Sequence, residues 1–225
     1  MKTRETSNRT GLMLLAIASG SSDVIAFLLL GHVFASAMTG NTALLGIALS
    51  DGNWIAVTQP LSALLGFAAG VGVATLVANP KAAPARQKRM VRDLLVLEIA
   101  CLALFAIIWQ TGHPKTGETI HYVLILLCSF AMGIQGVVAK RIDAPGVNTI
   151  VFTTTLVTII SSAVGILSGR VDDPAVRSAT MLQVSAFAAY GGGAMLAGLL
   201  YWAEFALLPW LPLAAVVVVL VAGRR

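Results

Sequence analysis

A short polar cluster inside a long apolar stretch is the clearest candidate for chemistry in this chain. The stretch runs almost unbroken from residue 11 to residue 49, and the cluster consists of Thr39, Gly40, Asn41 and Thr42. Threonine hydroxyls and asparagine amides donate and accept hydrogen bonds, as recognition of a small solute or ion requires. Irregular backbone at membrane depth is tolerated only where protein or a water-filled cavity covers it. The cluster predicts such a cavity; the alternative is that its side chains only satisfy nearby backbone groups.

Asp23 lies past the middle of the apolar segment 11–30 and is the strongest single candidate for a functional residue. A carboxyl group within a span is costly and rarely faces lipid. Its neighbours Ser19, Gly20 and Ser22 form a small polar helix face that lets backbone or water approach. Asp23 is thus a candidate coupling site for a proton or cation, or a hydrogen-bond acceptor for a solute. The alternative is a protonated or hydrogen-bonded carboxyl that packs against the polar cluster.

The second half of the chain offers weaker candidates of the same kinds. Thr153, Thr154, Thr155 and Thr158 form a hydroxyl cluster within the ambiguous segment 148–168. We expect this cluster to face the first one across a shared site. When the second half of the chain is aligned with the first, Gln135 falls close to the position of Asp23. Gln135 therefore either completes a polar pair between the two halves or forms a hydrogen bond with a neighbouring helix.

The elements that position these residues must be membrane helices. Of the 225 residues, 57% are hydrophobic and only 11% are charged, and the mean hydropathy of +0.87 lies far outside the range of soluble domains. The longest polar stretch, 79–93, is too short for a soluble domain. We therefore expect an all-α, polytopic membrane protein with one transmembrane domain over residues 1–225.

Hydropathy predicts about six spans and two short, broken or re-entrant helices. The predicted spans are 11–30, 54–78, 94–110, 120–139, 180–202 and 205–222, and the short segments are 34–49 and 148–168. Pro209 and Pro212 fall in the first half of the last span and should kink or shorten it. Within the first short segment, Thr39 or Asn41 is expected to cap a helix over 42–49.

The positive charges favour a definite topology over nucleic-acid binding. The net charge is +5, and lysines and arginines gather at both termini and in the loop 79–93. Positive residues accumulate on the cytoplasmic side of membrane proteins. If 34–49 crossed the membrane, that loop would lie outside, whereas two re-entrant segments place every basic cluster inside. Both termini are then cytoplasmic.

This plan makes residues 11–110 and 120–222 two repeats of opposite orientation. A weak sequence echo agrees: Ala18-Ser19-Gly20 and Thr42 recur as Ala131-Met132-Gly133 and Thr155 at one common offset, although Asn148-Thr149 offers a competing register. Inverted repeats with interrupted helices are typical of secondary transporters, with the solute site near the midplane between repeats.

The other glutamate, histidine and cysteine side chains of the apolar segments are expected to have structural roles. Glu98 and Glu204 are expected to reach the membrane interface by snorkelling. His32 is expected to be interfacial, a pH-sensitive gate being the alternative. Cys101 and Cys128 lie within spans and should be buried. We find no catalytic motif, no cofactor motif and no spacing of metal ligands, so we expect neither an enzyme nor a metal site.

Three motifs also carry a resemblance to a known family. They are Gly20-x-x-Asp23, the Phe27-x3-Gly31-His32-Val33-Phe34 run, and Met38-Thr39-Gly40-Asn41-Thr42-x-Leu44-Leu45-Gly46. With these motifs the chain resembles the YoaK-like, DUF1275 family of bacterial inner-membrane proteins over nearly its whole length. The resemblance implies a plasma-membrane protein of six-helix type and uncharacterised function. Relatives tend to show a second Thr-Gly in the later half, whereas Val157-Thr158-Ile159 lacks the glycine, which favours the first half as the site.

The sequence thus predicts a small bacterial inner-membrane transporter or channel for a small solute or ion. The rival prediction is a non-transporting partner or assembly protein that acts through glycine-rich helix faces such as Gly66-xxx-Gly70. A chain of 225 residues is small, so a homodimer is a further way to enclose a path.

Overall fold

The computed structural model describes residues 2–78, 83–112, 114–141 and 152–222. In this part of the chain all regular secondary structure is helical, which confirms the predicted all-α fold class. The helices are α1 (Lys2–Leu29), α2 (Met38–Ser50), α3 (Trp54–Val77), α4 (Pro84–Gly112), α5 (Thr119–Arg141), α6 (Phe152–Leu167), α7 (Pro174–Trp202), the 3-10 helix η1 (Leu208–Trp210) and α8 (Leu211–Ala222).

Four described helices are long and apolar enough to cross a membrane: residues Arg9–Leu29 of α1, and the whole of α3, α5 and α7. Two of the six predicted spans therefore differ. The apolar part of α4 follows several charged residues, and α8 is only 12 residues long. Pro209 lies in η1 and Pro212 in the first turn of α8, so the prolines shorten this last element as the sequence predicts.

The predicted basic loop 79–93 is largely helical. The helix α4 begins at Pro84, a favoured first helical residue, and continues through Ala, Arg, Gln and Lys, which are good helix formers. Lys81, another of its basic residues, lies outside the described residues. The helix therefore extends beyond its apolar part, and the charges of its first turns remain exposed.

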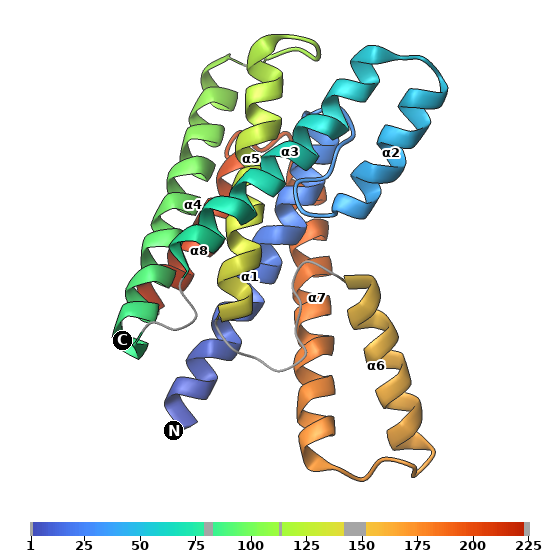
Figure 1. Ribbon diagram of the computed structural model, residues 1–225, viewed down its shortest axis with the longest axis vertical. Helices are drawn as coiled ribbons and strands as arrows, with labels where there is room; N and C mark the ends of the chain where they lie inside the picture. Colours follow the sequence, from blue (N-terminus) through green and yellow to red (C-terminus); the bar gives the residue numbers. More distant parts are fainter. Residues whose placement is uncertain (1, 79–82, 113, 142–151, 223–225) are drawn as a thin grey trace.

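The two short helices run in opposite directions from the middle of the molecule (Figure 1). The chain leaves the top of α1, returns to about mid-height, and enters α2, which runs back to the top. The helix α6 starts at about mid-height and runs to the bottom, where α7 begins. Both short helices thus start and end in the same half, as a re-entrant segment does.

The packing pairs repeat in the same inverted order. Helix α3 packs against α5 as α7 packs against α1, and α4 packs against α5 as α8 packs against α1. The short helices also correspond, since α2 packs against α3 and α6 against α7. The two halves of the described chain therefore use equivalent interfaces.

Glycines at these interfaces correspond residue by residue. A Cβ atom on Gly20 of α1 would overlap the backbone of Tyr190 on α7, and one on Gly133 of α5 would overlap the backbone of Phe67 on α3. Gly20 and Gly133 are the pair that the sequence echo aligned. Close backbone approach at both positions explains why glycine is needed there. Intramolecular packing accounts for this part of the repeat.

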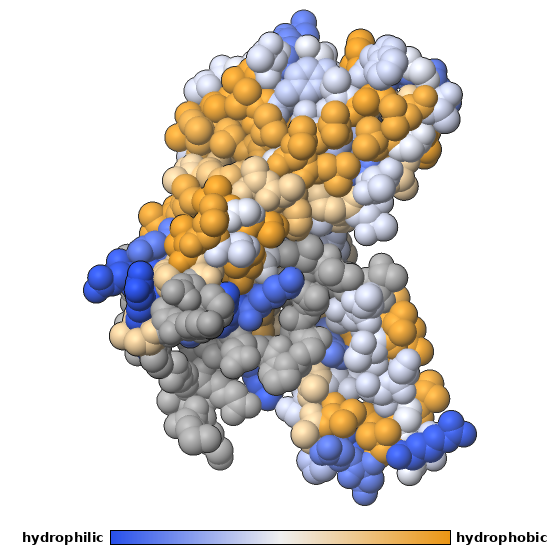
Figure 2. All heavy atoms as spheres, viewed as in Figure 1, coloured by the Kyte–Doolittle hydropathy of each residue, from blue (hydrophilic) through white to orange (hydrophobic). Residues whose placement is uncertain are grey.

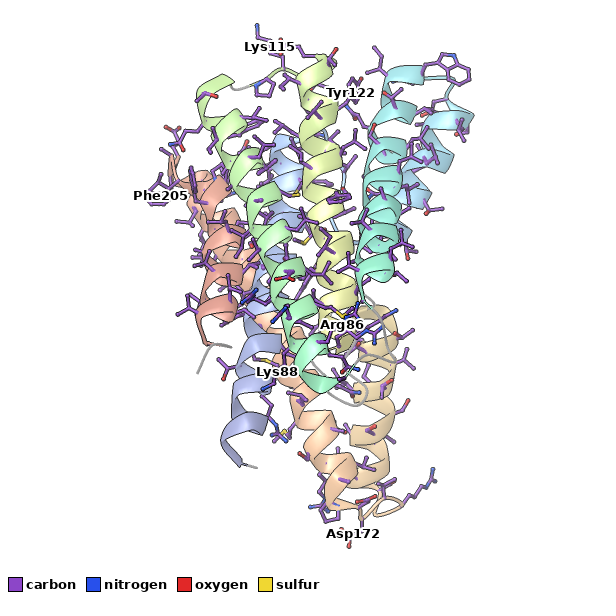
Figure 3. All side chains as sticks on the ribbon, turned by 60° about the vertical axis from the view of Figure 1, so that its left-hand side comes forward. Arg86, Lys88, Lys115, Tyr122, Asp172 and Phe205 are labelled. Atoms are coloured by element: carbon purple, nitrogen blue, oxygen red, sulfur yellow. The ribbon has the colours of Figure 1, made fainter. Side chains whose placement is uncertain are left out.

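Charge is distributed unevenly between the two ends. Arg86 and Lys88 lie in the lower half of the molecule and Asp172 at its lower end, whereas Lys115 and Tyr122 lie at the top (Figure 3). Figure 2 shows a broad apolar surface over the upper helices and strongly hydrophilic residues towards the lower left and the lower end. The topology expected from the basic clusters stays a prediction.

Candidate functional site

The carboxyl group of Asp23 is buried and holds the irregular segment between α1 and α2. Its Oδ1 accepts hydrogen bonds from the backbone N–H of Ser36 at 2.6 Å and of Ala37 at 3.4 Å. Its Oδ2 accepts from the Ser36 hydroxyl at 2.7 Å and from the Tyr190 hydroxyl of α7 at 2.6 Å. A carboxylate has about four acceptor sites, and four donors occupy them here. The geometry therefore matches the alternative of a hydrogen-bonded carboxyl.

The network continues one helical turn deeper into α1, at Ser19. The hydroxyl of Ser19 lies 2.8 Å from that of Ser36, and both side chains are buried. Ser19 and Asp23 are four positions apart, so they share one face of α1. Of the small polar face predicted from the sequence, Ser19 contacts the irregular segment, whereas Gly20 lies against α7.

Asn41 fixes the same segment from the other side. Its Oδ1 accepts from the backbone N–H of Phe34 at 2.9 Å, and its Nδ2 donates to the backbone carbonyl of Phe34 at 2.7 Å. The side chain is fully buried and replaces the partner strand or helix that this backbone lacks. The predicted cap is wrong, because α2 begins at Met38 and Ala37 occupies the N-cap without a side-chain bond. Asn41 lies inside the helix because its amide serves Phe34 instead.

The turn that leads into this segment has unusual backbone. Gly31 and His32 follow one another with φ values of +79° and +64°. Histidine rarely adopts such a conformation, and the His32 ring packs edge-on against Phe27 with the centroids 5.0 Å apart. Phe27 also stacks on Phe34, and a Cβ on Gly40 would overlap the Phe34 ring. The exposed His32 thus belongs to an aromatic support for the turn.

The two threonines of the polar cluster point away from this network. Thr39 and Thr42 are exposed, and the Thr42 hydroxyl donates to the backbone carbonyl of Met38 in its own helix at 2.9 Å. Any solute that contacts them must therefore approach the outer face of α2. In Figure 2 the surface is indented on the right, between the regions of α2 and α6.

The polar residues of the second half lie elsewhere. Gln135 is buried and donates from Nε2 to the backbone carbonyl of Leu15 at 2.9 Å, so it bonds a neighbouring helix. Leu15 is two turns below Asp23 on α1, and a pair of Gln135 with Asp23 is therefore not formed. Of the two interpretations left open for Gln135, this geometry fits the helix–helix bond.

The threonines of α6 are divided between its two faces. Thr155 is buried, while Thr154 and Thr158 are exposed, and the Thr158 hydroxyl donates to the backbone carbonyl of Thr154 at 2.9 Å. The side chain of Thr153 lies outside the described residues. Because α6 packs against α7 and lies below α2 in Figure 1, the two hydroxyl clusters do not form one hydrogen-bonded site.

No described residue forms an ion pair with Asp23. The ion pairs in the described part of the chain, Arg92 with Asp93 and Arg177 with Asp172, both lie at exposed positions. The backbone donors to Asp23 belong to Ser36 and to Ala37, the N-cap of α2, so the positive end of that helix dipole faces the carboxyl group. These donors and the helix dipole stabilise negative charge on Asp23, so a solute that binds the carboxyl group must first displace one of the four donors.

Glu98 contradicts its prediction as an interfacial residue. It is fully buried in the middle of α4, and both carboxyl oxygens lack a hydrogen-bond partner among the described residues. Glu98 is buried because α4 packs against α5 and α8, and the sequence of α4 alone does not show this packing. Glu204, in contrast, is exposed, as expected. It lies at a pocket of about 400 Å³, which Trp109 and Tyr201 also line and which contains none of the predicted site residues.

Sequence reasoning missed two residues of the network, Ser36 and Tyr190. Ser36 gave a signal as a hydroxyl residue just before the polar cluster of the apolar stretch 11–49. Tyr190 offered none, because only the packing of α7 on α1 brings it to Asp23. Within the described residues, no group of three histidine, cysteine, aspartate or glutamate side chains is arranged to hold a metal ion.

Comparisons with known proteins agree with the resemblance seen in the sequence. The family model described as "Protein of unknown function (DUF1275)" matches residues 11–222. The chain is 32% identical over 215 residues to "UPF0700 transmembrane protein YoaK" of Bacillus subtilis (strain 168), an alignment that covers 96% of this chain and 93% of that protein. The comparison with solved structures found no match. The match over nearly the whole chain shows that this membrane protein belongs to the DUF1275 family.

Proposed function

We propose that this protein moves a small solute or ion across the membrane through a polar site around Asp23. One observation carries the proposal: a single buried carboxyl group joins α1, the irregular segment before α2, and α7 of the other half. An intramembrane acid is by default a functional candidate, and solute sites in inverted-repeat transporters lie where broken helices meet between repeats.

The network gives the site a way to open. A solute that accepts from the Tyr190 hydroxyl or donates to Asp23 would compete for the bond between them. Loss of that bond would free α7 from the irregular segment, which Asn41 would still hold to α2. Since Asp23 has no cationic partner, the solute class that fits is neutral and polar, or cationic.

The same charge pattern supports a location and a topology. We propose that the protein resides in the bacterial plasma (inner) membrane, with the N-terminus, the basic residues of α4 and the C-terminus in the cytoplasm. The support is the gathering of lysine and arginine near the termini and in the first turns of α4, where Arg86 and Lys88 lie in the lower half of the molecule (Figure 3). Homodimer formation and the absence of nucleic-acid binding stay predictions.

Fewer glycines are available for the rival function, in which the protein binds a partner through glycine-rich helix faces. Gly66 and Gly70 are occupied, because a Cβ on either would overlap the backbone of α5. Gly191 and Gly192 of α7 still face open space. A partner helix or a second copy of the chain could therefore pack against this face of α7.

Flux into proteoliposomes tests the proposal. Purified protein is reconstituted, and entry of water, glycerol and urea is followed by stopped-flow light scattering. Entry of protons is followed with trapped pyranine under a potassium diffusion potential. We expect at least one probe to enter faster than into empty liposomes.

The variant Asp23→Asn is the matched test of the site. Its flux should change by about tenfold or more, which corresponds to about 1.4 kcal/mol. Asp51→Asn, in the exposed turn after α2, is the control and should leave flux unchanged. Folded protein that passes none of the probes above background, or equal effects of the two variants, would count against the proposal.

A further inference from the structure

Glu98 is a buried acid that the Asp23 site does not use. It lies in the middle of α4 with no solvent exposure, and neither carboxyl oxygen has a hydrogen-bond partner in the described part of the molecule. Asp23 is buried to a similar degree but has four donors around it. The two acids therefore experience opposite environments within one protein.

The surroundings of Glu98 are apolar. Leu94, Leu102 and Phe105, which lie one or two turns away on the same face of α4, are almost completely buried. This face belongs to the main hydrophobic core, and α4 packs mainly against α5 and α8. Glu98 therefore interrupts an otherwise apolar contact surface.

No described cation lies close enough to neutralise a carboxylate at Glu98. The elements α3, α8 and η1 contain no ionisable side chain. On α5 the ionisable residues are His121 and Tyr122 near the top, Cys128, and Lys140 and Arg141 in the last turn.

The antiparallel packing of α4 and α5 allows an estimate of the distance to the nearest lysine. It places Glu98 near the level of Gly133, which leaves Lys140 about 10 Å away along the axis. On α4 itself, Cys101 is the nearest titratable neighbour, and Arg92 is paired with Asp93.

An ionised carboxylate in such a place lacks both a counter-ion and a donor, so the neutral acid is the form that fits. Even the neutral acid leaves its O–H group unbonded. A leucine would fill the same space without this cost, so packing does not account for a glutamate here. Binding a proton does account for it.

We propose that Glu98 is a proton-binding site in the buried core of the helix bundle, which holds a proton in the described conformation and releases it to water when the interface of α4 opens. On release the O–H bond breaks, its electron pair stays on the carboxylate, and the proton passes to a water molecule. The proton site itself does not depend on the proposed transport function. One consequence does rest on that function, namely that the coupling ion is H⁺.

Infrared spectroscopy of the protein in lipid tests the site without any transport assay. Glutamate labelled with ¹³C at the carboxyl group shifts the C=O band of a protonated glutamic acid and separates it from any aspartic acid band. We expect such a band at neutral pH and its reversible loss as the pH is raised, while the amide bands show that the fold is intact.

Variants assign the band to one residue. Glu98→Gln should remove it, whereas Glu204→Gln, at an exposed position, should leave it unchanged. If Glu98→Gln does not fold, a hydrophobic carbodiimide applied to the unaltered protein replaces it, since mass spectrometry should then find the adduct on the peptide that contains Glu98 and less of it at alkaline pH.

The outcomes separate clearly. A band that titrates reversibly and belongs to Glu98 supports the site, even if the liposome flux assays fail. Absence of the band would mean that the carboxyl is ionised, and a band that persists at every pH where the protein stays folded would mean a locked structural proton. Either result overturns the proposal.

Discussion

The hydrogen bond between Tyr190 and Asp23 provides the sharpest test of the network. The substitution Tyr190→Phe removes one hydroxyl and leaves the ring in place. The bond is 2.6 Å long and ends on a carboxyl group that is 3% exposed. Hydrogen bonds to charged groups contribute about 1.5–3 kcal/mol, whereas bonds between neutral groups of membrane helices average about 0.6 kcal/mol. We predict a loss of about 1.5–3 kcal/mol in the free energy of unfolding.

The assay is reversible unfolding in mixed detergent micelles, followed by circular dichroism. Tyr122→Phe is the matched control, because its hydroxyl accepts a bond from Thr58 at 3.2 Å in an exposed position. Its effect should stay within about 0.5 kcal/mol. A double-mutant cycle with Asp23→Asn should then return a coupling energy of about 1–3 kcal/mol.

The reasoning is refuted if Tyr190→Phe costs no more than Tyr122→Phe. Zero coupling between Tyr190 and Asp23, with both single variants folded, would also refute it. Either result would mean that the two side chains do not interact in the membrane, and the link that they form between α7 and the Asp23 network would be wrong.

Three further predictions use the same unfolding measurement. Gly70→Val should prevent native packing or cost more than about 3 kcal/mol, because its side chain would overlap the α5 backbone, while Gly72→Val, which meets nothing within 4 Å, should be near neutral. Similar stability of these two variants would contradict the α3–α5 interface. Asn41→Leu should cost roughly 1–3 kcal/mol for each backbone group of Phe34 that it leaves unbonded, and an unchanged stability would show that Asn41 does not hold this segment. Glu98→Leu should raise stability by about 1 kcal/mol or more, and a lower stability would show that the carboxyl has a partner.

The sequence was most informative where composition and charge act over many residues. The all-α fold, the short helix before residue 50 and the opposite course of the second short helix all follow from hydropathy and from the distribution of lysine and arginine. The glycine correspondence was foreseeable at Gly20 and Gly133 alone, because those two residues lie in the short aligned echo. The glycines of α3 and α7 at the same two interfaces show no such similarity in sequence. Only their contacts with the backbone of α5 and of α1 show that they correspond.

Individual polar contacts were harder to foresee, for identifiable reasons. An asparagine near a helix start is usually a cap, yet Asn41 serves Phe34, because the chain folds back over the first turn of α2. Tyr190 reaches Asp23 only through tertiary packing, which leaves no pattern in the local sequence. Glu98 was misplaced because its burial comes from the packing of α4 against α5 and α8, which hydropathy does not reveal.

Accessibility of single cysteines tests the central claim that α2 and α6 enter the membrane from opposite faces. Cysteine is placed at Asp51, at Lys88 and at Asp172, and labelling by an impermeant thiol reagent is measured in intact and in permeabilised cells. Cysteine replaces Asp172 and not Asp173, because the side chain of Asp173 caps α7. The native cysteines are buried and should give little background. We predict labelling of position 51 alone in intact cells, and of all three positions after permeabilisation. Labelling of position 88 but not 51 in intact cells would mean that the segment containing α2 crosses the bilayer, and the inverted arrangement would be wrong.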